Sequence, residues 1–268
     1  MKLEGKVALV TGAAHGQGAS HARYLAAEGA KIAALDICAD IPPIYPLGTR
    51  QELAALVAEL RADGAEAIAI EADVRSSQQI EAAVGLTVAE LGGLDVLCNN
   101  AGVCIVEAVD EISDDSLDAM VDVNLKGVFN TIRFVAPVMK AQRWGKIINT
   151  TSAAAQNALP YISAYCAAKA GVLVATQSWA RELAEWEINV NSVSPGTIFS
   201  GMTTGLADQL GLEVEDAYQQ FMSQQVFKGE RGKVQKEDIS RMVVYLASED
   251  ARMITGQNYA VDAGWSIT

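Results

Sequence analysis

The chain has 268 residues, of which 50% are hydrophobic and 20% charged, and its formal net charge at pH 7 is −13. This length suits one α/β domain with a sizeable core, and the hydrophobic content excludes a disordered chain. The acidic balance argues against nucleic acid or an anionic membrane as a partner, and no apolar run approaches the length of a membrane span. Because the N-terminus leads straight into an apolar run without the organisation of a signal peptide, we expect a cytoplasmic protein.

A glycine-rich turn follows the first apolar run. Residues 6–11 have the sequence KVALVT, which is typical of a buried parallel strand, and the segment GAAHGQG at 12–18 then precedes an alanine-rich helical stretch. Glycines allow such a turn to be sharp and let a pyrophosphate approach the helix N-terminus. The spacing G-x-x-x-G-x-G is weak evidence alone, but its place between a strand and a helix predicts a dinucleotide site.

An acidic residue ends the next apolar run, KIAALD. Asp36 stands twenty residues after Gly16, where a carboxylate hydrogen-bonds the ribose of an adenosine. The same carboxylate would repel a 2′-phosphate, and residues 13–17 hold no Lys or Arg to neutralise one. The pattern therefore favours NAD over NADP.

Residues 37–49, ICADIPPIYPLGT, interrupt the alternation of strands and helices. Their three prolines exclude a regular helix or a central strand. One interpretation is a tolerated surface insertion. The other is a cover over the adenosine half of the cofactor, with an apolar face formed by Ile41, Ile44, Tyr45 and Leu47.

The cysteines and histidines carry little signal. Cys38, Cys98, Cys104 and Cys166 show no C-x-x-C spacing, so we expect reduced, unpaired thiols. The two histidines form no metal-binding pattern, and no metal site is expected.

The clearest chemical signal is a serine, a tyrosine and a lysine just after the middle of the chain. Tyr165 and Lys169 are four residues apart and share one face of a helix, while Ser152 ends the apolar run KIINTTS. A lysine ammonium near a tyrosine lowers the tyrosine pKa from about 10 toward the range useful for proton transfer. Ser152 can hydrogen-bond the same substrate oxygen. The trio predicts proton-coupled hydride chemistry on an alcohol or a ketone.

In this order, the motifs resemble those of the short-chain dehydrogenases/reductases of the common short type, through nearly the whole sequence. The resemblance rests on the glycine turn, on NNAG at 99–102, on Asn124 in VNLKGVF, on the trio, on PGT at 195–197 and on MITGQNYAVDAG at 253–264. Gln17, between the last two glycines, and Lys236, before Glu-Asp, depart from the family pattern.

The resemblance implies a single Rossmann domain over residues 1–268, a doubly wound α/β fold with about seven parallel strands. Apolar runs near 6–11, 31–36, 66–70, 94–98, 145–150, 188–194 and 257–261 agree with it. It implies catalytic roles for Asn124, Ser152, Tyr165 and Lys169. It also implies that the cofactor is bound by Gly12, His15, Gly16, Gln17, Gly18, Asp36, Ile37, Asp73, Val74, Asn100, Ala101, Gly102, Tyr165, Lys169, Pro195, Gly196 and Ile198.

Two segments then acquire expected roles. Residues 197 to about 232 correspond to the substrate lid of the family, and their surplus of apolar residues predicts an adaptable apolar pocket. The insertion at 37–49 resembles one in the mycofactocin-associated, carveol dehydrogenase-like subset. That subset tends to hold NAD without free exchange, which implies an external redox partner.

The leading expectation is an NAD-dependent oxidoreductase that interconverts a hydrophobic secondary alcohol, cyclic or terpenoid-like, and its ketone. A 3-oxoacyl thioester reductase is an alternative, although Asp36 and the net charge of −13 speak against NADP and against an acidic carrier. A non-catalytic, cofactor-sensing protein on the same fold is another, opposed by the complete set of catalytic residues. The family resemblance also implies a homotetramer.

Overall fold

The computed structural model describes residues 1–223 and 225–268, and residue 224, inside the expected lid, lies outside the described part. One sheet contains all the strands, in the order β3-β2-β1-β4-β5-β6-β7, and every pair is parallel. The strands are β1 (Val7–Thr11), β2 (Lys31–Asp36), β3 (Ala67–Glu71), β4 (Val96–Asn99), β5 (Gly145–Thr150), β6 (Ile188–Pro195) and β7 (Asn258–Val261). The expected doubly wound parallel sheet is confirmed, with strand bounds within about two residues of the apolar runs.

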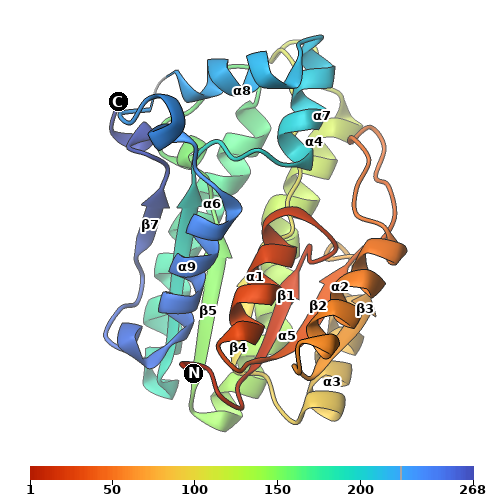
Figure 1. Cartoon of the computed structure of the whole chain (residues 1–268), viewed down its shortest axis with the longest axis vertical. Coiled ribbons are helices and arrows are strands. Elements are labelled where there is room, and N and C mark those ends of the chain that lie inside the picture. The colour runs from red at the N-terminus through yellow and green to blue at the C-terminus, as the bar shows by residue number, and fades with distance from the viewer. Residues whose placement is uncertain (224) are drawn as a thin grey trace.

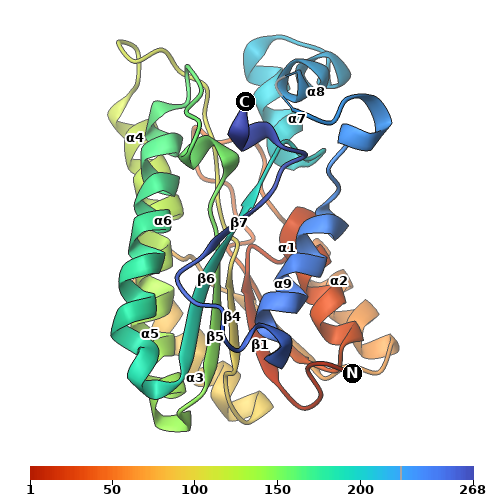
Figure 2. The same cartoon turned by 90° about the vertical axis from the view of Figure 1, so that its left-hand side faces the viewer.

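Helices cover both faces of the sheet, which gives three layers (Figure 2). The helices are α1 (Gly16–Ala27), α2 (Arg50–Ala62), α3 (Ser77–Leu91), α4 (Asp114–Val121), α5 (Gly127–Gln142), α6 (Ser163–Leu183), α7 (Gly201–Leu210), α8 (Val214–Met222) and α9 (Lys236–Ala247). A π-helical turn, Asp122–Lys126, joins α4 to α5. Helices α1, α2 and α9 lie on one face of the sheet and α3 to α6 on the other (Figure 2).

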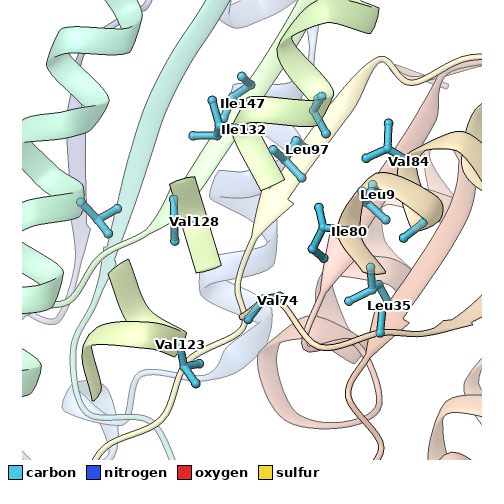
Figure 3. Close-up of a cluster of buried hydrophobic side chains, with 14 of the residues drawn as sticks. Leu9, Leu35, Val74, Ile80, Val84, Leu97, Val123, Val128, Ile132 and Ile147 are labelled. Carbon is cyan, nitrogen blue, oxygen red and sulfur yellow. The ribbon is translucent and has the colours of Figure 1, made fainter. Parts of the chain in front are cut away.

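Strand composition explains this layering. Every residue of β1 and β5 is buried, and the apolar residues at their centres are what a strand covered on both faces requires. On the α3 and α5 side, Ile80 and Ile132 face Leu97 of the central strand β4 (Figure 3). Side chains of α1, α2 and α9 form a second cluster on the opposite face.

Local signals set the ends of the elements near the site. The Thr49 hydroxyl accepts the Glu52 N–H, and the Glu52 carboxylate accepts the Thr49 N–H at 2.8 Å, so a capping box starts α2 and ends the insertion. Ser200 caps α7. Because all strands are parallel, their carboxyl ends lie at one edge of the sheet, below α7 and α8 (Figure 1). Ligands of open α/β sheets bind at this edge.

Candidate active site

A cavity of about 630 Å³ lies at the carboxyl edge of the sheet. It extends from the glycine turn after β1, past Asp36, to the trio and the lid. Its walls hold these residues of the expected site: Gly12, His15, Gly16, Gln17, Asp36, Ile37, Asp73, Val74, Asn100, Ala101, Gly102, Ser152, Tyr165, Lys169, Pro195, Gly196 and Ile198. Gly18 and Asn124 are not on the wall, and both lie directly behind it.

The glycine turn is shaped by close backbone contacts. Gly12 has a φ of +66°, and a Cβ on it would lie 2.9 Å from Ala101 Cα. A Cβ on Gly18 would overlap the Gly12 carbonyl oxygen, so Gly18 supports the turn from behind instead of lining the cavity. Asn100 Nδ2 donates to the Thr11 carbonyl oxygen at 3.0 Å. These contacts hold the turns after β1 and β4 against each other.

Asp36 lies at the adenosine end of the cavity. Its Oδ2 accepts the Ala14 N–H at 3.0 Å, and its Oδ1 accepts the Cys38 N–H at 3.2 Å. Gly48, at the end of the insertion, closes over the same carboxylate, because a Cβ there would lie 3.2 Å from Asp36 Oδ1. The insertion is therefore adjacent to the Asp36 carboxylate.

The chemistry of the walls fits a dinucleotide. An elongated ligand would meet a glycine turn at a helix N-terminus, a carboxylate for a ribose and Lys169 at the far end. Gln17 Oε1 is buried and has no hydrogen-bond partner among the described residues, which leaves an acceptor available beside the turn. Beside Gly16, which has a φ of +60°, a Cβ would meet only open space.

Ser152, Tyr165 and Lys169 converge from β5 and α6. Lys169 Nζ lies 5.8 Å from the centre of the Tyr165 ring and donates to the Thr150 carbonyl oxygen at 2.9 Å. Ser152 caps the turn at 153–155 by accepting the Ala154 N–H at 3.1 Å. Its hydroxyl also lies beside the Tyr165 hydroxyl. The three side chains thus surround one point of the cavity.

Burial dominates the electrostatics of the trio. Desolvation raises the pKa of Tyr165, and the hydrogen bond from Ser152 only partly opposes it. Desolvation also lowers the pKa of Lys169 from 10.5 to about 8. The sequence-based expectation that the lysine charge lowers the Tyr165 pKa is thus outweighed in the protein alone, because both side chains are buried and the ammonium is directed at Thr150.

Asn124 shapes the site from below. It is fully buried in the π-helical turn, where its Oδ1 accepts the Val103 N–H at 3.2 Å and its Nδ2 donates to the Val103 carbonyl oxygen at 2.8 Å. A Cβ on Gly102 would lie 2.9 Å from Asn124 Oδ1 and 3.2 Å from Lys169 Nζ. Gly102 therefore lets the asparagine, the lysine and the β4 turn meet.

Comparison with known proteins decides the family. The short chain dehydrogenase family model matches residues 6–211. The chain belongs to this family. Two curated relatives are similar over almost their whole length. A 3-oxoacyl-[acyl-carrier-protein] reductase of Staphylococcus aureus is 39% identical over 259 residues, which cover 97% of each chain. A (-)-trans-carveol dehydrogenase of Rhodococcus erythropolis is 38% identical over 274 residues, which cover 99% of each.

A solved structure extends the similarity to the fold. The crystal structure of a carveol dehydrogenase from Mycobacterium avium in complex with NAD has a TM-score of 0.93 and 34% sequence identity, and the match covers 100% of this chain and 99% of that one. The sequence-based resemblance to carveol dehydrogenases is confirmed.

In this short-chain dehydrogenase, the wall of the cavity formed by residues 197–223 has no charged side chain. This segment contributes these lining residues: Thr197, Ile198, Ser200, Gly201, Met202, Thr203, Leu206, Leu210, Leu212, Gln220 and Ser223. Helix α7 contacts the loop after β4, where Gln209 Oε1 accepts the Val106 N–H at 3.0 Å. Phe199 and Phe227, counted as apolar lid residues in the sequence, are 54% and 44% exposed and do not line the cavity.

Sequence reasoning missed several wall residues. Val103 and Cys104 follow NNAG directly, and Leu159 and Tyr161 precede α6. Trp265, which is 3% exposed, reaches the cavity from the C-terminal tail. Val103 and Cys104 could have been found because they follow the turn after the central strand β4, whereas no sequence pattern points to Trp265. Among the described residues, no cluster of metal-binding side chains occurs, and no helix has the length and apolar character to cross a bilayer.

Proposed function

We propose that this dehydrogenase interconverts a hydrophobic secondary alcohol and its ketone with NAD. The observation that carries the proposal is the contrast between the two ends of the cavity. The trio meets an uncharged, largely apolar wall built from the lid, while the charged residues Asp36 and Asp73 lie at the cofactor end. Such a pocket binds a compact apolar molecule and directs its one reactive oxygen to the polar groups.

Each residue of the trio has its own role in the proton transfer. Ser152 hydrogen-bonds the reacting oxygen, and Tyr165 takes the hydroxyl proton in oxidation or returns it in reduction. Lys169 supplies positive charge at the same end of the cavity. When bound, NAD would supply the hydride acceptor, and the charge of its nicotinamide ring would favour the Tyr165 phenolate against the effect of burial.

The preference for NAD over NADP is supported by the charges near the ribose site. Asp36 presents a carboxylate there, and Lys169 is the one Lys or Arg on the described wall of the cavity. Arg50, the first residue of α2, is already paired with Glu71 through two hydrogen bonds of 2.7 and 2.8 Å. A 2′-phosphate would therefore meet repulsion without a free partner.

The similarity to the Staphylococcus aureus reductase supports a second candidate, the reduction of a 3-oxoacyl thioester. The apolar lid would accept an acyl chain equally well. Against this candidate, two basic side chains at or just beyond the end of the lid are already engaged: Lys233 pairs with Glu230 at 2.7 Å, and Arg231 lies over the Phe227 ring. An acidic carrier protein would have to compete for them.

One experiment separates the two candidates. Purified protein is assayed with cyclic secondary alcohols and NAD, with and without an artificial electron acceptor, and with acetoacetyl thioesters and NADH or NADPH. Turnover of the alcohols that the Tyr165→Phe variant lacks would support the proposal. Faster turnover of the thioesters with NADPH would replace it with the second candidate, and binding of NAD without any turnover would favour the cofactor-sensing alternative.

The insertion supports slow exchange of the cofactor. Gly48 lies against Ala14 and Asp36, while Ile41, Tyr45 and Leu47 line the same cavity, so a bound dinucleotide would pass beneath the segment. Retained NAD(H) would then pass its electrons to a redox partner outside the site. Absorbance and mass spectrometry of the purified protein test whether the cofactor is carried through purification.

An exposed apolar face supports a homotetramer. Phe129 and Val174, on the outer side of the α5 and α6 layer, are 48% and 63% exposed, and Phe129 packs edge-on against Trp179. Light scattering on the eluted protein tests the oligomeric state, and charge substitution at Val174 should shift it toward smaller species. The cytoplasmic location expected from the sequence stays a prediction that cell fractionation tests.

A further inference from the structure

The insertion at 37–49 reaches the substrate end of the cavity as well as the adenosine end. Ile41 and Ile44 are buried in the same apolar cluster as Cys104 and Tyr165. Within the insertion, Tyr45 contacts Gly205 of α7, while Gly48 lies against Asp36 and Ala14.

Tyr45 is fixed on two sides. Its ring packs against Gly205 of α7, where a Cβ would overlap the ring and would lie 2.6 Å from Tyr45 Cβ. Its hydroxyl lies beside the backbone N–H of Cys104, a residue that is 1% exposed and lines the cavity. A phenol held between a helix and a loop loses little further rotational freedom when a ligand binds.

The Tyr45 hydroxyl lies near the reacting centre. Burial raises the pKa of Tyr45, and a negative charge on Tyr165 would raise it further, so the Tyr45 phenol keeps its proton. Among the described residues, none accepts the proton of the Tyr45 hydroxyl. Since Tyr45 lines the cavity, this proton is available to a ligand.

We propose that Tyr45 determines substrate specificity by donating a hydrogen bond to a second oxygen of the substrate, while Ser152 and Tyr165 hold the reacting oxygen. The favoured substrates are then cyclic hydroxyketones and diketones instead of simple cyclic ketones. The inference rests on the proposed alcohol and ketone chemistry and names its substrate class. A site built to hydrogen-bond an oxygen discriminates against the analogue that lacks it, because a buried polar group is then left without a partner.

The test compares cyclohexanone with the matching cyclohexanediones. In wild-type protein, kcat/KM should be higher for at least one dione, and Tyr45→Phe should lower the ratio of dione to monoketone by about tenfold, as expected for one lost hydrogen bond. Tyr24→Phe, which removes a hydroxyl on α1 outside the cavity, is the matched control and should keep the ratio. An equal ratio in wild type and Tyr45→Phe would overturn the inference.

A second variant tests the same position without removing the hydroxyl. Gly205→Ala places a methyl group where the Tyr45 ring lies, so the ring must move and the ratio should fall although the phenol is intact. A Gly205→Ala protein with the wild-type ratio would show that the placement of Tyr45 does not set specificity.

A binding measurement separates this inference from the proposed function. Calorimetry measures the Kd of each ketone for the NAD-loaded protein, a complex that needs no turnover. Tighter binding of a dione that is lost in Tyr45→Phe would support the role of Tyr45 even if no alcohol were oxidised. Turnover of simple alcohols together with equal dione affinity in both proteins would leave the proposed function intact and refute the inference.

Discussion

Replacing Gly48 with alanine should speed the release of NAD(H). Gly48 is the point at which the insertion closes over the adenosine end of the cavity. A Cβ there would lie 2.6 Å from Ala14 Cβ and 3.2 Å from Asp36 Oδ1, whereas ordinary van der Waals contact begins at 3.4 Å. The neighbours belong to β2 and the glycine turn, which the sheet holds in place, so the end of the insertion must move outward.

The expected increase in the dissociation rate of NAD(H) follows from the free-energy cost of overpacking. Inserting a methyl group into a close contact costs about 1–3 kcal/mol, and this cost falls on the closed form of the insertion. With about 1.4 kcal/mol for each factor of ten, NAD(H) should dissociate roughly fivefold to a hundredfold faster. Stopped-flow fluorescence of bound NADH, displaced by excess NAD, measures the rate.

Gly85→Ala is the matched control. Gly85 lies inside α3, and a Cβ on it would meet no atom within 4 Å, so this change should leave the dissociation rate as it is. If Gly48→Ala and Gly85→Ala release NADH at the wild-type rate, the insertion does not cover the cofactor and the proposed retention is wrong.

The other predictions concern the trio and the ribose site. Tyr165→Phe should remove nearly all turnover while NAD binding, measured by fluorescence titration, stays close to wild type, and near-normal kcat would contradict the assigned role. The pKa of Lys169 is about 8 in the folded protein, against 10.5 for a lysine exposed to water, so the unfolded chain binds an extra proton between these values. The difference in unfolding free energy between the cofactor-free wild type and Lys169→Met, measured by urea denaturation, should therefore shift in favour of the wild type by about 3 kcal/mol from pH 8 to pH 10.5. NAD should bind roughly thirtyfold more tightly than NADP, a difference of about 2 kcal/mol. In the double variant Asp36→Ala with Ile37→Arg, the ratio of kcat/KM with NAD to kcat/KM with NADP should fall. Equal wild-type values for the two cofactors would refute the role of Asp36.

The parallel sheet was predictable because each strand carries its own signal. The runs ending at Asp36 and Thr150 are short with apolar centres, which suits a strand buried on both faces. The positions of Ser152, Tyr165 and Lys169 followed in turn, since a strand end and one helix face bring them together.

Long-range packing could not be predicted in the same way. That Tyr45 lies against Gly205 depends on two segments 160 residues apart, and neither has a pattern that refers to the other. The pKa of Tyr165 depends on how deeply α6 buries the ring, which spacing does not encode. Gly18 and Asn124 illustrate a further limit, because a motif shows that a residue is needed near a ligand but not whether it contacts the ligand or supports the wall.

The insertion also bears on kinetics, because it contacts both ends of the site. The same thirteen-residue segment, 37–49, contacts the Asp36 carboxylate through Gly48 and helix α7 through Tyr45. For the dinucleotide to leave, the insertion must move away from Asp36. A small alcohol can enter when the lid opens, without release of Gly48 from Asp36. Under this arrangement the cofactor would behave as a prosthetic group, reduced by one small molecule and reoxidised in place by another. Such a cycle is double displacement, and its signature is a set of parallel lines in double-reciprocal plots with the two small substrates varied.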